Sequence, residues 1–335
     1  AKAEGATSMT HWWQPQASTD VRTGMTAQLY NKMLKFSKDG EIEWSLDGDR
    51  LIQGETDGSS FPNGGLRATH TAGAYLTPDP SSPPFIRDDV MYIPSVLITY
   101  NGDALDEKLP LLRSADALKR EGARLMKHLG LDTDTVFAQI GLEQEIFMIP
   151  RQHFLDRPDL LHTGRTVMGK FAPRGQEMSD HYMAPLATNS VFVDAMAKVQ
   201  EKCFEMGIPL ATRHKEVAPG QFEFAPMFGS MTTQIDQNLL VMQIIEEVAK
   251  DYGLAALFTE KPFDGVNGSG KHNNWSIATG DGTNLLNPKQ ILAKTGSTDV
   301  FAIVMAAMLT AVDEHGDLMR LSISCPGNDF RLGAC

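Results

Sequence analysis

The sequence predicts an α+β fold, with a small β-rich N-terminal domain over residues 1–110 and a larger domain over residues 111–335. Turn-forming residues crowd the first region, most densely from Thr77 to Pro84, and short extended segments lie between them. From Ser114 onward, stretches with helical apolar spacing alternate with short strands that carry acidic side chains. This change of character places the domain boundary near residue 110.

Length, charge and cysteine content narrow the class of protein. The chain has 335 residues, of which 42% are hydrophobic, and this is enough for one large core or two domains. Its net charge is −12 and its basic residues are scattered, which argues against a nucleic-acid partner, because phosphate binding needs Lys and Arg patches. Three cysteines are too few for a disulfide framework and favour a reducing, intracellular compartment.

The elements follow from local patterns. In the first domain, residues 40–51 and 90–100 are expected to be extended. Ser114 is expected to cap a helix that reaches His128 and ends at Gly130. Three more helices are expected over residues 188–206, 232–252 and 299–318, with apolar spacing at Phe192, Met196, Val199, Cys203 and Met206 in the first and with Ile235, Leu239, Met242 and Val248 on one side of the second.

The longest apolar run, Val300–Val312, belongs to the last of these helices. It spans about thirteen residues, whereas a bilayer requires roughly twenty. The run therefore predicts a buried helix, and no membrane partner is expected.

Residues 137–149 predict a strand that carries two acids on one face. Even positions are almost all apolar, and the odd positions place Glu143 and Glu145 side by side, because side chains alternate across a strand. Burying either carboxylate unpaired would be costly, so a positive group is expected between them. The alternative is a solvent-facing edge strand, on which acids are ordinary.

A second segment brings further acids around a turn. His214 and Glu216 share one strand face, Glu223 lies on the next strand, and a turn at Pro219–Gly220 folds the two strands toward one point. Surface acids that merely flank a turn are the alternative.

The third segment, Asn267–His272, is rich in glycine, which lets backbone groups approach a small polar ligand closely. His272, Asn274 and Ser276 then alternate onto one face of the following strand. A flexible hairpin with an ordinary histidine is the alternative. Taken together, four carboxylates and one or two imidazoles on extended segments favour a site for hard divalent cations over a structural zinc site.

These stretches resemble the motifs of a known family. Three segments look like glutamine synthetase motifs: Glu143–Glu145, Glu216–Glu223 and Asn267–Ser276. Four more resemble the type III branch of that family: Thr10–Pro15, Gln53–Gly65, Glu260–Phe263 and Arg331–Ala334. The likeness runs in order over nearly all residues from 10 onward. It implies a β-grasp-like N-terminal domain and a catalytic domain whose curved, mainly antiparallel sheet is covered by helices.

The resemblance also implies roles for single residues. One metal would be held by Glu145, Glu216 and Glu223, and another by Glu143 and His272. The substrate amino acid would be received by Asn267, Gly268 and His214, with Arg331 on its α-carboxylate. Lys271, Asn274 and Ser276 would contact ATP, although Asn274 stands where many relatives carry histidine. Asp57 would reach a neighbouring subunit and help to bind ammonium, so that Asp57, Glu216 and Arg331 are the expected catalytic residues.

The implied reaction is the ATP-dependent ligation of ammonia to L-glutamate through a γ-glutamyl phosphate, in nitrogen assimilation. Two or more Mg²⁺ or Mn²⁺ ions would serve each site, because phosphoryl transfer needs cations held by oxygen ligands. The implied assembly is a homo-oligomer, a double-ring dodecamer whose active sites are shared between subunits. A glutamate–amine ligase of the same family, a non-catalytic structural relative and, more remotely, a guanidino kinase are the alternatives.

The ends of the chain give one further expectation. The first residue is Ala1, and the chain stops soon after Arg331, before further active-site segments that the resemblance implies. We therefore expect truncation at both ends, little activity from this segment alone, and a cytoplasmic location or, since a leader could be missing, an organelle.

Overall fold

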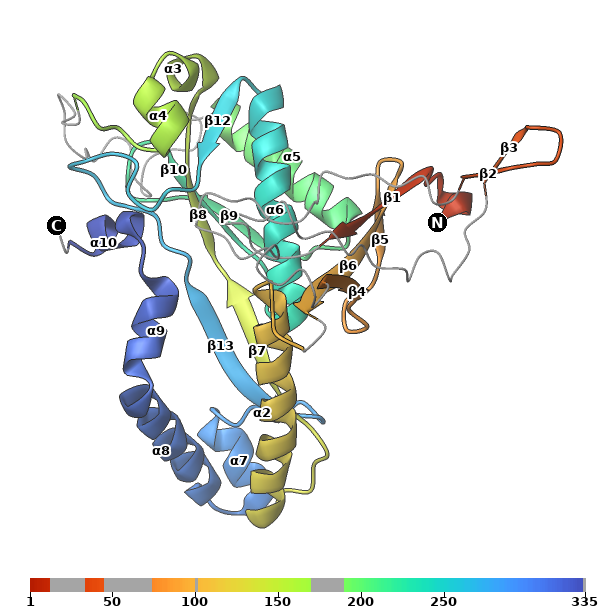
Figure 1. The fold of residues 1–335 in the computed structure, drawn as a ribbon. Helices are drawn as coiled ribbons and strands as arrows, with labels where there is room; N and C mark the ends of the chain where they lie inside the picture. The colour runs from red at the N-terminus through yellow and green to blue at the C-terminus, as the bar shows by residue number, and fades with distance from the viewer. Residues whose placement is uncertain (13–33, 45–73, 100–101, 170–189, 334–335) are drawn as a thin grey trace. The chain divides into compact units, whose positions relative to one another are not determined.

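The computed structural model describes residues 1–12, 34–44, 74–99, 102–169 and 190–333 (Figure 1). The chain divides into two compact units, Ala1–Ala117 and Leu118–Cys335. The helix α2 (Lys108–His128) runs across this division. Each unit is described by itself.

The first unit is built on a four-stranded sheet. Its central strand is β6 (Val90–Thr99), which pairs in parallel with β1 (Ser8–Trp12) and antiparallel with β4 (Ala74–Pro78) and β5 (Phe85–Arg87). A 3-10 turn, η1 (Lys2–Glu4), precedes β1. The strands β2 (Leu34–Phe36) and β3 (Ile42–Trp44) form a separate hairpin. The strand expected over 90–100 is therefore present, whereas the part of 40–51 beyond residue 44 lies outside the described residues. A β-grasp-like arrangement stays a prediction.

The second unit combines two antiparallel sheets with helices, so the α+β fold class is confirmed. One sheet has the order β12–β8–β10–β9 and the other the order β11–β7–β13. The strands are β7 (Val136–Leu142), β8 (Gln144–Pro150), β9 (Thr212–Lys215), β10 (Gln221–Ala225), β11 (Gly229–Ser230), β12 (Leu254–Leu257) and β13 (Asn273–Thr279). The helices after α2 are α3 (Arg151–Leu155), α4 (Pro158–Thr163), α5 (Ser190–Glu205), α6 (Met231–Asp251), α7 (Pro288–Thr295), α8 (Asp299–Glu314), α9 (Gly316–Ile323) and α10 (Pro326–Leu332).

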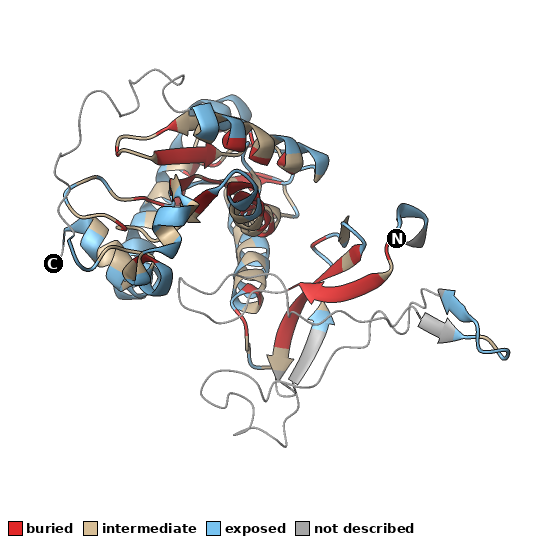
Figure 2. Ribbon diagram, turned by 90° about the horizontal axis from the view of Figure 1, so that it is seen from above, coloured by how far each residue is buried: buried red, intermediate tan, exposed pale blue. Residues whose placement is uncertain are grey.

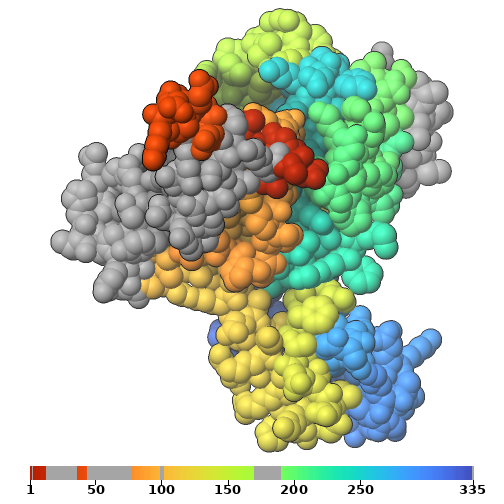
Figure 3. Space-filling model, turned by 90° about the vertical axis from the view of Figure 1, so that its right-hand side faces the viewer, coloured from red at the N-terminus to blue at the C-terminus, as the bar shows by residue number. Residues whose placement is uncertain are grey.

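Burial is concentrated on the strands and on the helix sides that cover them (Figure 2). On α5, Met196, Val199 and Cys203 are buried, as their spacing predicts. A second cluster joins the end of α2 to α7 and α8 through Met126, Val136, Leu285, Ile291 and Val300. In Figure 3, the yellow atoms around the end of α2 lie against the blue atoms of the segment that follows β13.

The start of α2 differs from the prediction. The helix begins at Lys108 rather than after Ser114, because the carboxylate of Asp106 accepts hydrogen bonds from the backbone N–H groups of Leu109 (3.0 Å) and Leu97 (2.9 Å). Pro110 fits the first turn, where its missing N–H is not needed. The Ser114 hydroxyl donates to a carbonyl inside the helix instead, so it is not the cap.

The buried side of α6 contains only one of the four apolar residues that the prediction places together, Val248. The other buried apolar residues of its second half include Leu240, Val241, Ile244 and Ile245. Near its start the helix packs on β7 with the amide side chains of Gln234 and Asn238, which are buried beside Leu142.

The structure has two helices where a single helix was expected over 299–318: α8 ends at Glu314, and α9 begins after His315. The apolar run within α8 is not a buried helix: Val300 and Val304 are buried, whereas Leu309 is 65% exposed and Val312 is 48% exposed. One side of α8 reaches the cluster with α2 and α7, through Val300, Phe301, Val304 and Met308. Among the described helices, none is both long and apolar enough to cross a bilayer.

Candidate metal and substrate site

Glu143 lies between two strands rather than within one. The strand predicted over 137–149 is divided there into β7 and β8, which belong to different sheets. The backbone N–H of Glu143 donates to the carbonyl of His272 (3.1 Å), and its side chain remains partly exposed. Glu145 follows on β8 and is only 8% exposed. The prediction of one continuous strand was therefore wrong, although both acids lie in the same part of the fold.

The hairpin predicted around Pro219–Gly220 is present, as β9 and β10. Glu223 on β10 lies opposite Glu145 on one side and opposite His214 on the other. The Nε2 atom of His214 lies 2.8 Å from Glu216 Oε1 and 2.6 Å from Glu223 Oε2. Three predicted residues are thus brought together by the pairing of neighbouring strands.

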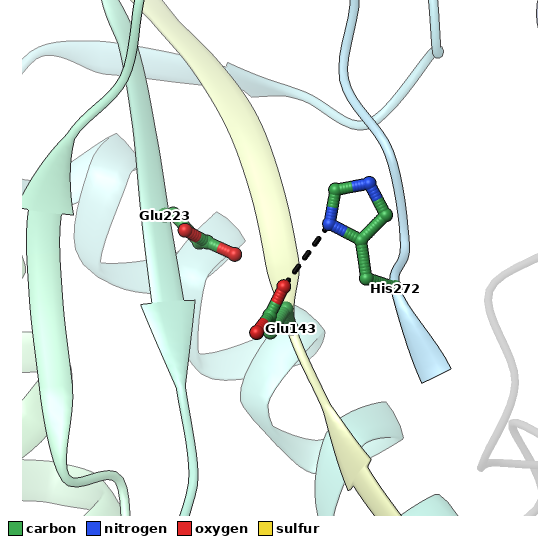
Figure 4. A group of neighbouring side chains, drawn as sticks. All are labelled: Glu143, Glu223 and His272. Atoms are coloured by element: carbon green, nitrogen blue, oxygen red, sulfur yellow. Dashed lines mark hydrogen bonds and ion pairs between the residues drawn. The ribbon is translucent and has the colours of Figure 1, made fainter. Parts of the chain in front are cut away.

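The glycine-rich segment contributes the remaining polar groups. His272 Nδ1 lies 3.0 Å from Glu143 Oε2, as drawn in Figure 4, and 3.8 Å from Glu145 Oε1. The side-chain amide of Asn274 donates to Glu143 Oε1 (2.8 Å). The backbone N–H of Gly270 donates to Glu145 Oε2 (2.7 Å).

Among the residues that the structure describes, two groups of side chains have the composition of a divalent-cation site, and they share Glu223. One is Glu143, Glu223 and His272, and the other is His214, Glu216 and Glu223; in each, the possible ligand atoms lie within 4.8 Å of one another. The fit of a cation is supported by Glu223 Oε1, which is buried without a hydrogen-bond partner among the described residues. Carboxylates and imidazole, without any thiolate, suit Mg²⁺ or Mn²⁺.

The carboxyl groups influence one another strongly. Burial and the negative charges of Glu143 and Glu216 raise the pKa of Glu223 to about 8. Burial also raises the pKa of Glu145, and Glu216 adds to this shift. For Glu143, burial favours the neutral acid, but hydrogen bonds from Asn274 and His272 outweigh it and lower the pKa. A cation among these groups would favour the ionised form of each.

Arg331 reaches the same place from α10. Its Nη2 lies 3.3 Å from His272 Nε2, and its Nη1 donates to Asn328 Oδ1 (3.2 Å). A Cβ atom on Gly270 would lie 2.5 Å from Arg331 Nη2 and 2.6 Å from His272 Nε2. A side chain at position 270 would therefore displace the ends of Arg331 and His272 from their present positions.

A pocket of about 430 Å³ opens beside β13. Asn274 and Ser276, both expected to contact a nucleotide, line it, and the Ser276 hydroxyl donates to Gln139 Oε1 (3.4 Å). Two exposed aromatic rings, Phe228 and Trp275, line the pocket as well. Sequence reasoning assigned no role to either ring, because one exposed aromatic residue has no pattern of its own.

The other predicted residues are placed as follows. Asn267 and Gly268 lie on the loop before Gly270, and the Gly268 carbonyl accepts a hydrogen bond from Gln221, a residue without a predicted role. Lys271 is exposed, with its Nζ 3.3 Å from Met242 Sδ. Asp57 lies outside the described residues.

Two family models match the chain. The one described as "Glutamine synthetase type III N terminal" matches residues 1–114, and the one described as "Glutamine synthetase, catalytic domain" matches residues 116–320. Similar curated proteins include a type-3 glutamine synthetase of Dictyostelium discoideum, 41% identical over 99% of this chain, and a glutamine synthetase of Bacteroides fragilis, 40% identical over 100% of it. The chain spans 44% of the length of each of these two relatives.

Solved structures agree in fold. A structure described as a GmaS/ADP complex has a TM-score of 0.55 and 17% identity, with 86% of this chain and 56% of that chain covered. A glutamine synthetase of Plasmodium falciparum has a TM-score of 0.53 and 16% identity, with 85% and 53% covered. From the length of the family match and the whole-chain similarity to type III proteins, this chain belongs to the glutamine synthetase family, in its type III branch.

Proposed function

We propose that this chain carries the metal centre and part of the substrate site of an ATP-dependent glutamate–ammonia ligase, which forms glutamine through a γ-glutamyl phosphate. The observation that carries the proposal is the sharing of Glu223 between two carboxylate–imidazole groups built from separate segments. Two neighbouring cation positions suit phosphoryl transfer onto a carboxylate, which must be activated before it can form an amide.

Mg²⁺ or Mn²⁺ bound here would neutralise phosphate oxygens and hold donor and acceptor in line. We assign one position to Glu143, Glu223 and His272 and the other to Glu216 and Glu223, with Glu145 as a further ligand. His214, which contacts both Glu216 and Glu223, is assigned to the side-chain carboxylate of the substrate.

Arg331 is assigned to the α-carboxylate of glutamate, since a guanidinium presents a rigid fork of donors that matches a carboxylate. Asn267 and Gly268 lie on the neighbouring loop and are assigned to the same substrate. Asp57 is assigned to ammonium, which an anionic side chain would attract and help to deprotonate.

The pocket beside β13 is proposed for ATP. Asn274 and Ser276 offer polar groups, Phe228 and Trp275 offer faces on which a base can stack, and Lys271 offers a positive charge for phosphate. We further propose that the protein forms a double-ring dodecamer with shared active sites and that it is intracellular. Both proposals rest on family membership.

The test uses the complete gene product that contains this sequence. Purified protein is expected to convert glutamate, ATP and ammonia into glutamine, ADP and phosphate, only with Mg²⁺ or Mn²⁺ present. Glu223→Gln should lower kcat at least about a hundredfold, because it removes a carboxylate from both cation positions. Faster turnover with ethylamine than with ammonia would replace the proposal by an amine ligase, and absence of turnover would favour a non-catalytic relative. Light scattering would give the number of subunits.

A further inference from the structure

We propose that Gln221 is a positioning residue, which holds the loop Asn267–Gly270 against the hairpin that carries Glu216 and Glu223. The inference rests on the proposed function, because that function assigns the loop to glutamate. Gln221 is only 1% exposed and lies where three parts of the site meet.

The side-chain amide of Gln221 is fully engaged. Its Nε2 donates to the Gly268 carbonyl (3.0 Å) and the Ser269 hydroxyl (3.1 Å), and a longer contact reaches Glu145 Oε2 (3.4 Å). Its Oε1 accepts a hydrogen bond from the backbone N–H of Ala218 (3.1 Å). One side chain therefore connects the β9–β10 turn, the glycine loop and the acid of β8.

The chemistry of the neighbours fixes the orientation of this amide. The N–H of Ala218 can only donate, so it must face the amide oxygen. The Gly268 carbonyl can only accept, so it must face the amide nitrogen. Flipping the amide would oppose oxygen to oxygen on one side and N–H to N–H on the other.

The position of Gln221 is itself fixed by the backbone. Its N–H donates to the Ala218 carbonyl (3.1 Å), and its carbonyl accepts from the N–H of Glu216 (2.8 Å). The loop is also anchored by the N–H of Ser269, which donates to the Glu260 carbonyl (2.6 Å), and by the N–H of Gly270, which donates to Glu145. Removal of the Gln221 amide should therefore loosen Gly268 and Ser269 while the hairpin with its carboxylates remains folded.

Two variants of the complete gene product test this role. Gln221→Met keeps the side-chain length and removes both hydrogen-bonding groups, and Gln221→Glu keeps the acceptor for Ala218 but places an oxygen opposite Glu145 and Gly268. The matched control is Gln234→Met, because Gln234 is also buried but lies on α6, where its Nε2 donates to Gln237 (3.2 Å). Each protein is examined by hydrogen exchange, thermal unfolding, Mg²⁺ titration and steady-state kinetics.

For Gln221→Met we expect amide exchange at Ser269 and Gly270 to become at least about tenfold faster and the KM for glutamate to rise about tenfold, with Mg²⁺ affinity within about twofold of the parent. Gln221→Glu should raise KM further. Unchanged loop exchange and KM in Gln221→Met, or the same changes in Gln234→Met, would overturn the proposal. Failure of the proposed function is seen separately, as absence of glutamine formation by the unsubstituted protein, and the exchange data still decide the role of Gln221.

Discussion

Glu223 shows how single residues in this site depend on a bound cation. Its carboxylate is buried, one of its oxygens has no hydrogen-bond partner among the described residues, and Glu143, Glu145 and Glu216 all add negative charge around it. An ionised acid in such a place is costly, so without metal the group retains its proton at neutral pH and its pKa rises to about 8.

This shift predicts a pH-dependent stability of the metal-free protein. A glutamate in the unfolded chain loses its proton near the ordinary pKa of 4.5, whereas folded Glu223 retains it up to about pH 8. The unfolded state therefore binds fewer protons across this window, and the free energy of unfolding falls as pH rises through it. In Glu223→Gln this contribution, of the order of 2 kcal/mol, should be absent.

Urea denaturation with EDTA present, at about pH 5 and about pH 8, measures the effect. The decrease in unfolding free energy between the two values should be smaller in Glu223→Gln than in the parent, while Glu205→Gln, on an exposed part of α5, should behave as the parent does. An equal decrease in all three proteins would show that Glu223 does not retain its proton.

Among the elements, the β9–β10 hairpin carries three residues of the site, His214, Glu216 and Glu223. Its turn contains Gly220, which has φ +67°, and a Cβ atom there would lie 3.0 Å from the Met148 carbonyl of β8. The hairpin is thus held close to β8 by a residue without a side chain.

We predict that Gly220→Ala costs more than the left-handed conformation alone. Gly207 has a similar φ of +73° with open space where a Cβ would be, so Gly207→Ala measures the conformational cost, about 1 kcal/mol. Gly220→Ala should lose about 1–3 kcal/mol beyond this, from crowding against β8. It should also weaken Mg²⁺ binding, which Gly207→Ala should leave unchanged.

Denaturant unfolding and Mg²⁺ titration of both variants check this prediction. Equal losses in the two proteins would mean that β8 yields to the added methyl group without cost.

The sequence predicted a helix or strand correctly where the local apolar pattern determines it. It did not where the structure depends on which strands pair with one another. The spacing of Met196, Val199 and Cys203 predicted the buried side of α5 correctly, because these residues recur at helical spacing and all three are buried. Apolar alternation continues through Glu143, so nothing local reveals that β7 pairs with β13 and β8 with β10. In the same way, the exposure of Leu309 depends on which neighbours α8 meets.

The site followed a similar division. Acids two residues apart and a Pro-Gly turn pointed to Glu143, Glu216 and Glu223, because their chemistry is visible in the sequence. No local pattern distinguishes Gln221, because its role depends on contacts with a loop more than forty residues away.

For the whole molecule, two electrostatic effects of Mg²⁺ must be separated. The chain carries a net charge of −12, and any added salt screens the resulting self-repulsion. Ions bound at the two groups that share Glu223 would act differently, because they bind the folded state specifically and stabilise it according to their concentration relative to Kd.

We therefore predict that Mg²⁺ raises the unfolding temperature beyond any effect of ionic strength. A hundredfold excess over Kd corresponds to about 2.7 kcal/mol, or about 5 to 10 °C for a domain of this size, and EDTA should reverse it. NaCl at matched ionic strength should give a much smaller shift, because the repulsion between separated surface charges is itself weak and screening removes only that. In Glu223→Gln the Mg²⁺ shift should fall to the NaCl level, since one carboxylate is removed from both groups. Calorimetry of the complete gene product measures the shifts of the unfolding temperature with Mg²⁺, with NaCl and in Glu223→Gln. Equal shifts with NaCl and Mg²⁺ would mean that the cations act on net charge alone.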